Sequence, residues 1–131
     1  MLTSASVTAN IPATDLTRAR SFYADTLGLK PAAEVPEAGL LIYRTDSGTA
    51  FSIYHTEFAG QAGHTVAQIH VDNVDAEARA LQAKGVTLET YDMPGVEWDD
   101  GIANMAEMGK AAWFKDSEGN ILCIDSGFPE G

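Results

Sequence analysis

The feature that most constrains the fold is a repeat in the order of the expected secondary-structure elements. In each half, an alternating strand pattern precedes a segment with helical spacing of apolar residues, and two strands of a hairpin follow. The expected strands cover residues 7–11, about 32–35, 40–44 and 50–54 in the first half, and residues 65–71, 86–90, 111–115 and 121–125 in the second. Both halves predict the order β-α-β-β-β, which indicates an α+β fold built from two modules.

Short polar residues and glycines set the expected helix limits, because Asp, Asn and Thr side chains accept hydrogen bonds from the first turn and glycine suits the position after the last. The candidate caps are Thr14 or Asp15 for the first helix and Asp72 or Asn73 for the second, with Gly28 and Gly85 at their ends. We place the first module at about residues 1–58 and the second at about residues 64–128, within a single domain covering residues 1–131.

The second module is longer than the first. Gly28 and Gly85 are 57 residues apart, whereas the hairpin glycines Gly48 and Gly119 are 71 apart, so about 14 extra residues lie within residues 89–109. This segment is either a lid or binding loop, or a solvated insertion. We predict that its Trp98 folds over a cleft mouth or across a dimer contact and touches the ligand; the alternative is that Trp98 anchors its own loop.

Alternate side chains of a strand point to opposite faces of its sheet, so the even and odd positions of each expected strand form two sets. One set is apolar and is expected to pack under the helices: Val7, Ala9, Ile11, Phe51, Ile53, Ala67, Ile69, Val71, Leu122 and Ile124. The other set is mixed: Ser6, Thr8, Asn10, Ser52, Tyr54, Val66, Gln68, His70, Ile121, Cys123 and Asp125. The mixed set indicates either a concave sheet around a partly wet cavity or an ordinary solvated sheet face.

Charge and composition limit the partners and the compartment. The chain has 8 Lys and Arg against 19 Asp and Glu, a net charge of −11 that disfavours nucleic acids and anionic membranes and allows a cationic ligand. No apolar run approaches the length of a membrane span, and residues 1–10 lack the pattern of a secretory signal. A single cysteine, Cys123, agrees with a reducing compartment, so we expect a cytoplasmic protein.

Two motifs and the repeated element order resemble the vicinal oxygen chelate superfamily, which includes glyoxalase I, bleomycin-resistance proteins and extradiol dioxygenases. The motifs are DLTRARSFY at residues 15–23, followed by LGL at residues 27–29, and DSEGN at residues 116–120. The resemblance implies that the two modules form a U-shaped mixed sheet around a cleft, with the helices outside, commonly in a homodimer. It does not specify a reaction.

Metal-using members of this superfamily place ligands on the first and last strands of each module. Carried over by motif, those positions are Thr8, Ser52, Val66 and Cys123, which do not supply the oxygen and nitrogen donors that a divalent ion needs. We therefore expect no metal and no cofactor. A shifted site using His55, His64 or His70 is the alternative, and Cys123 is interpreted as a buried filler rather than a nucleophile.

The sequence predicts a metal-free protein that sequesters a small, cationic or aromatic ligand, as the bleomycin-resistance branch does. The alternatives are a metal-dependent lyase, isomerase or dioxygenase of the same superfamily, and a dimeric scaffold or regulatory module. The candidate ligand-binding residues are Thr8, Asn10, Ser52, Tyr54, Val66, Gln68, His70, Trp98 and Cys123. No catalytic residue is assigned.

Overall fold

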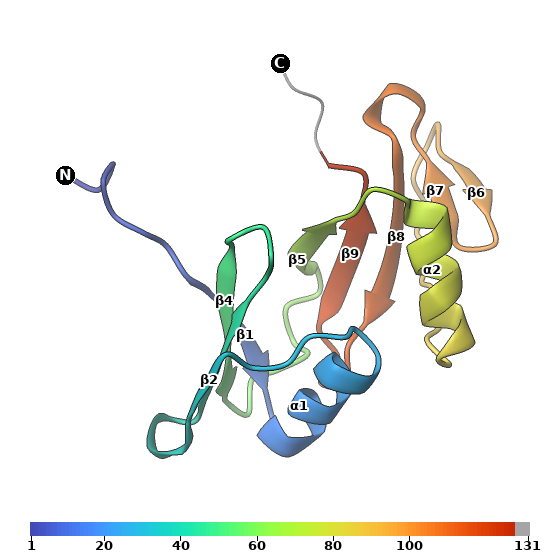
Figure 1. Cartoon of the computed structure of the whole chain (residues 1–131). Coiled ribbons are helices and arrows are strands. Elements are labelled where there is room, and N and C mark those ends of the chain that lie inside the picture. Colours follow the sequence, from blue (N-terminus) through green and yellow to red (C-terminus); the bar gives the residue numbers. More distant parts are fainter. Residues whose placement is uncertain (128–131) are drawn as a thin grey trace. The chain divides into compact units, whose positions relative to one another are not determined.

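The computed structural model describes residues 1–127, and the chain divides into two compact units, residues 1–59 and 60–131. The described residues of the two units contain two α-helices and nine strands in two mixed sheets, which confirms the predicted α+β class (Figure 1). Both helices have ten residues, and no helix in the described part of the chain is long and apolar enough to cross a membrane.

The first unit forms a four-stranded sheet with one helix. Its elements are β1 (Ala9–Ala13), α1 (Leu16–Asp25), β2 (Ala33–Val35), the short 3-10 helix Pro36–Ala38, β3 (Leu40–Arg44) and β4 (Ala50–His55). The strand order is β1-β4-β3-β2, with β1 parallel to β4 and the other pairs antiparallel. Parallel pairing of β1 with β4 requires a crossover, and α1 begins that connection.

The second unit repeats this arrangement and adds a strand. Its elements are β5 (Thr65–His70), α2 (Val74–Ala83), β6 (Glu97–Asp99), β7 (Ile102–Asn104), the short 3-10 helix Ala106–Met108, β8 (Lys110–Lys115) and β9 (Ile121–Asp125). The order is β5-β9-β8-β7-β6, so the central strands match those of the first sheet and β6 is an extra edge strand (Figure 1).

The structure shows which of the two candidate residues caps the N-terminus of each helix. Asp15 accepts a hydrogen bond from the backbone N–H of Arg18, and Asn73 accepts one from Ala76, both at 3.0 Å. After α1, Gly28 takes a left-handed conformation with φ of 73°, which lets the N–H of Leu29 reach the carbonyl of Tyr23 at 2.8 Å.

Two of the expected strands are wrong in detail. The first strand begins at Ala9 rather than at residue 7, and Val7, predicted to be in the core, is 88% exposed because the chain before Ala9 has no strand partner. The strand expected at residues 86–90 is reduced to one bridge, between Glu89 and Trp113. The segment at residues 89–109 contains the hairpin of β6 and β7, which extends the sheet.

The helix-facing side of each sheet forms its core. In the first unit, Tyr43 stacks on Phe51 with ring centroids 4.9 Å apart, and Tyr23 of α1 lies 5.8 Å from Tyr43. In the second, α2 packs on β7, β8 and β9. Its buried residues Val74, Ala78 and Leu81 share this core with Ile102, Ala112, Phe114, Leu122 and Ile124. Ala9 is exposed, whereas the predicted core residues Ile11, Ile53, Leu122 and Ile124 are confirmed.

Candidate functional site

In the second unit, polar, ionisable and aromatic side chains gather on the side of the sheet opposite α2. Residues directly opposite on paired strands share a face, so the register defines its rows. One row runs His70, Asp125, Ala111, Ala103 and Trp98; the next runs Gln68, Cys123 and Trp113, with Glu89 bridged to Trp113. We call these residues, with Tyr91, the polar–aromatic face.

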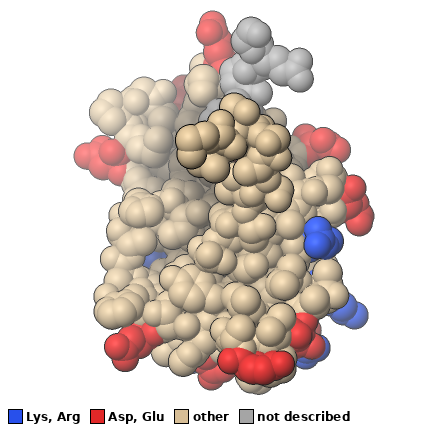
Figure 2. Space-filling view, turned by 90° about the vertical axis from the view of Figure 1, so that its left-hand side faces the viewer, with Lys and Arg blue, Asp and Glu red and all other residues tan. Residues whose placement is uncertain are grey.

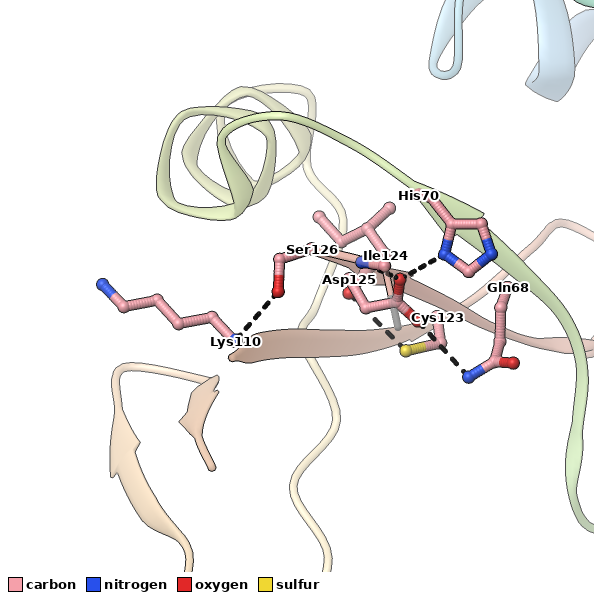
Figure 3. A network of polar contacts seen from close by, with 8 residues as sticks. Gln68, His70, Lys110, Cys123, Ile124, Asp125 and Ser126 are labelled. Atoms are coloured by element: carbon pink, nitrogen blue, oxygen red, sulfur yellow. Dashed lines mark hydrogen bonds and ion pairs between the residues drawn. The ribbon is translucent and has the colours of Figure 1, made fainter. Parts of the chain in front are cut away.

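A buried carboxylate organises the polar side of this face. Asp125 accepts a hydrogen bond at Oδ1 from His70 Nδ1 at 2.5 Å and from the backbone N–H of Gly127 at 2.9 Å. Its Oδ2 accepts from Gln68 Nε2 at 3.3 Å. Gln68 and His70 both reach Asp125 from β5 (Figure 3). The Asp125 side chain is 10% exposed and the His70 side chain 51%, so the imidazole is accessible while the carboxylate is largely covered.

Three aromatic rings form the other side of the face. Trp113 lies between the other two: the Tyr91 ring meets it edge-on at 5.8 Å and Trp98 lies 6.0 Å away at 53°. The indole N–H of Trp113 donates to Thr65 Oγ1 at 3.1 Å, which fixes the plane of the ring. An open hollow of about 520 Å³ adjoins them, lined by Thr90, Tyr91, Asp92, Met93, Val96 and Trp98.

A second hollow of about 420 Å³ lies elsewhere in this unit, lined by Gln82, Val86, Thr87, Leu88, Thr90, Asp100 and Gly101. Arg79 of α2 closes one side, donating to the Asp100 carboxylate at 3.0 Å and to its carbonyl at 3.1 Å. This hollow has no aromatic lining residue, so it offers no surface on which a flat ring can stack.

Cys123 lies between Gln68 and Trp113 on the polar–aromatic face, but its thiol is unreactive. The residue is 1% exposed, and its thiol contacts the carbonyl of Ile124 at 3.5 Å. Burial, and then the negative charge of Asp125, raise the pKa of the Cys123 thiol to about 12. A thiol of this kind is not a nucleophile at neutral pH.

Alkylation of Cys123 tests this assignment. At pH 8 we expect iodoacetamide to label the folded protein at least about 100-fold more slowly than the urea-unfolded protein, because the native thiol is covered and protonated. Mass spectrometry over time measures both rates on the same single cysteine. Comparable rates in the two states would show that the thiol is accessible and ionised, contrary to the structure.

The positions that correspond to metal ligands in the superfamily do not fit a divalent ion. Val66 has no donor atom, and the register of β5 against β9 skips it as a bulge between Thr65 and Ala67. Cys123 keeps its proton, as described above. Across residues 1–127, no three His, Cys, Asp or Glu side chains are grouped so as to hold a metal. His64 is exposed, with Nδ1 2.9 Å from the carbonyl of Thr65.

The first unit places its candidates on one face of its own sheet. Asn10 pairs with Ser52, and Tyr54 lies two residues further along β4, so these three side chains share the face opposite α1. Ser52 is buried, Asn10 is exposed and Tyr54 is 38% exposed. Thr8 precedes β1 and is exposed, and His55 ends β4 with its side chain on the other face.

Sequence reasoning missed six members of the polar–aromatic face as site residues: Glu89, Tyr91, Ala103, Ala111, Trp113 and Asp125. Parity placed Asp125 in the mixed set, but Asp125 was not assigned to the site. The available signal was the parity of residues 110–115, since pairing the two strands of the last hairpin puts Trp113 opposite Cys123. The contact between Trp98 and Trp113 required the unpredicted pairing of β6 and β7.

Comparisons with known proteins agree with this architecture. No curated protein sequence matches the chain. Among solved structures, the antibiotic-binding protein TnmS3 from Streptomyces sp. CB03234 has a TM-score of 0.63 at 22% identity, covering 93% of this chain and 96% of that one. A bleomycin-binding protein complexed with bleomycin has a TM-score of 0.69 at 17% identity, covering 95% and 99%.

An enzyme has the same fold. Lactoylglutathione lyase from Agrobacterium tumefaciens matches with a TM-score of 0.65 at 18% identity, covering 93% of this chain and 92% of that one. The family model of the glyoxalase/bleomycin resistance protein/dioxygenase superfamily matches residues 5–124, nearly the whole chain. The two βαβββ-type units and this match together show that the chain belongs to the glyoxalase/bleomycin resistance protein/dioxygenase superfamily.

Proposed function

We propose that this protein is a metal-free binding protein that sequesters a small ligand containing a flat aromatic ring. The observation that carries the proposal is the grouping of Tyr91, Trp98 and Trp113 beside the hollow of about 520 Å³. Aromatic side chains bind flat groups by stacking and by edge-to-face contact. The hollow combines the apolar and aromatic side chains of Tyr91, Met93, Val96 and Trp98 with the polar side chains of Thr90 and Asp92, which can orient a ligand.

The donor chemistry of the chain favours binding over metal-dependent catalysis. An aliphatic side chain at Val66 and a protonated thiol at Cys123 cannot replace carboxylate or imidazole ligands. One structural relative is an antibiotic-binding protein and another is a bleomycin-binding protein, which supports this class of function without specifying the ligand.

The charge of the protein favours neutral or cationic ligands over anions. The net charge is −11, and Figure 2 shows Asp and Glu side chains dispersed over one face of the molecule, with few Lys or Arg among them. A negative potential of this kind repels phosphorylated or strongly acidic compounds.

We also propose that the protein is a homodimer, as the resemblance to the superfamily implies. Sedimentation velocity measures the assembly state.

Titration with a simple ring compound tests the proposed function. Dansylamide, a neutral flat fluorophore, is added to the purified protein, and we expect quenching of tryptophan emission together with a raised melting temperature, because ligands that bind the native state stabilise it. Bleomycin is the second probe. Elemental analysis of the same preparation is expected to show no stoichiometric divalent metal.

Two results would overturn the proposal. One is that neither dansylamide nor bleomycin binds at millimolar concentration. The other is about one tightly bound divalent ion per chain that is lost on substitution of His70, together with lyase, isomerase or dioxygenase activity. The first result would favour a scaffold or regulatory role, and the second would favour a metal-dependent enzyme.

A further inference from the structure

The polar side of the polar–aromatic face lies within reach of a ring held against Trp113. Trp113 pairs with Cys123, and Asp125 is two residues further along β9, so Trp113 and Asp125 occupy diagonal positions on adjacent strands. Such positions are about 7–8 Å apart and their side chains point to the same side of the sheet. A short aliphatic chain attached to a ring at Trp113 therefore spans the distance to the Asp125 carboxylate.

The Asp125 carboxylate has room for another donor. Its Oδ1 accepts two short hydrogen bonds, from His70 and Gly127, whereas its Oδ2 accepts from Gln68 at 3.3 Å. A carboxylate offers about four acceptor positions, so its capacity is not filled by these three donors. The Gln68 side chain is exposed, and its long hydrogen bond yields at low cost to a charged donor that approaches Oδ2.

Among the basic side chains of the described residues, His70 alone pairs with Asp125, and this pair is ionic only when the imidazole is protonated. No Lys or Arg in this part of the chain forms an ion pair with Asp125, and Lys110 on the neighbouring strand directs its Nζ to Asp75, at 2.7 Å. Burial, and then the charge of Asp125, raise the pKa of the Cys123 thiol, and burial, and then the charge of Glu89, raise the pKa of Tyr91, so two carboxylates act on this face. Cations are therefore favoured here.

We propose that Asp125 binds an ammonium or similar basic group of the ligand, while the ring of the same ligand packs against Trp113 and Trp98. His70 and Gln68 are positioning residues that hold the carboxylate. This inference rests on the proposed function and narrows its ligand class to flat compounds that carry a basic group on a short flexible arm.

Three probes with the same ring separate this inference from the proposed function. Dansylamide reports ring binding alone, dansylcadaverine adds a pentyl arm ending in a primary amine, and its N-acetyl derivative keeps the arm without the charge. For the wild-type protein we expect dansylcadaverine to bind about tenfold more tightly than the acetylated probe, the effect of one charge-assisted hydrogen bond. Isothermal titration calorimetry measures all three dissociation constants.

Two charge-removing variants locate the effect. Asp125→Asn should abolish the preference for the amine over the acetylated arm. Asp99→Asn is the matched control: it removes the same charge from the same sheet, but Asp99 pairs with Ile102 and lies on the opposite face, so the preference should persist. Circular dichroism confirms that each variant is folded.

The outcomes are distinguishable. If wild-type protein binds dansylamide but shows no preference for the amine, the inference is wrong and the proposed function stands. If Asp99→Asn removes the preference as fully as Asp125→Asn, net charge rather than Asp125 is responsible, and the inference is again wrong. If none of the three probes binds, the inference is wrong, and if bleomycin does not bind either, the proposed function is wrong as well. A wild-type protein without a preference for the amine refutes the inference even where Asp125→Asn does not fold.

Discussion

Asp116→Ala is expected to lower the free energy of unfolding by about 3 kcal/mol, since it leaves several buried donors without an acceptor. Asp116 is 6% exposed; its Oδ1 accepts the backbone N–H groups of Glu118 and Asn120, and its Oδ2 accepts the Asn120 amide, each at 2.9 Å. The Asn120 amide oxygen in turn accepts the N–H of Gly60 at 3.3 Å, so the loss spreads beyond the hairpin. Urea unfolding followed by circular dichroism measures the change.

The equivalent hairpin of the first unit provides the control. Thr45 occupies the position that corresponds to Asp116, and its hydroxyl contacts those of Ser47 and Thr49 in an exposed loop. Thr45→Ala is expected to cost less than about 1 kcal/mol, because water replaces lost partners at an exposed site. Equal losses for the two substitutions would mean that burial of the Asp116 carboxylate does not stabilise the fold.

Trp98→Ala is expected to weaken the binding of dansylamide by about fivefold or more, corresponding to about 1 kcal/mol or more for an aromatic anchor. Trp98 lines the hollow of about 520 Å³ and lies 6.0 Å from Trp113, so its removal takes away one ring and loosens another. The dissociation constant is measured by dansyl fluorescence on protein shown to be folded.

Phe58→Ala is the control for the loss of an aromatic side chain, because Phe58 is 67% exposed and lies in the first unit. It should leave dansylamide binding unchanged. The opposing view, that Trp98 only anchors its own hairpin, predicts a lower urea midpoint for Trp98→Ala with unchanged affinity per folded molecule. That combination would remove Trp98 from the binding site.

Local patterns predicted most of the fold. The order of elements in the first unit and the two hairpins depend on residues within a few positions of one another, and the structure confirms them. It also selects Asp15 and Asn73 from the two candidate caps of each helix. The site was less predictable from the same signals. Gln68, His70 and Cys123 were assigned to one face, but parity failed at Val66, where the strand bulges and Thr65 takes the contact to Trp113.

The sequence by itself determined both helices, most strands outside residues 86–104, and which side of each sheet is apolar, because periodicity, capping and turn residues act locally. The tertiary structure decided how β6 and β7 extend the second sheet and therefore that Trp98 meets Trp113. It also decided that His70 and Gln68 close on Asp125, 55 and 57 residues away in the chain. These contacts depend on which strands pair and in what register, and no local pattern encodes that choice.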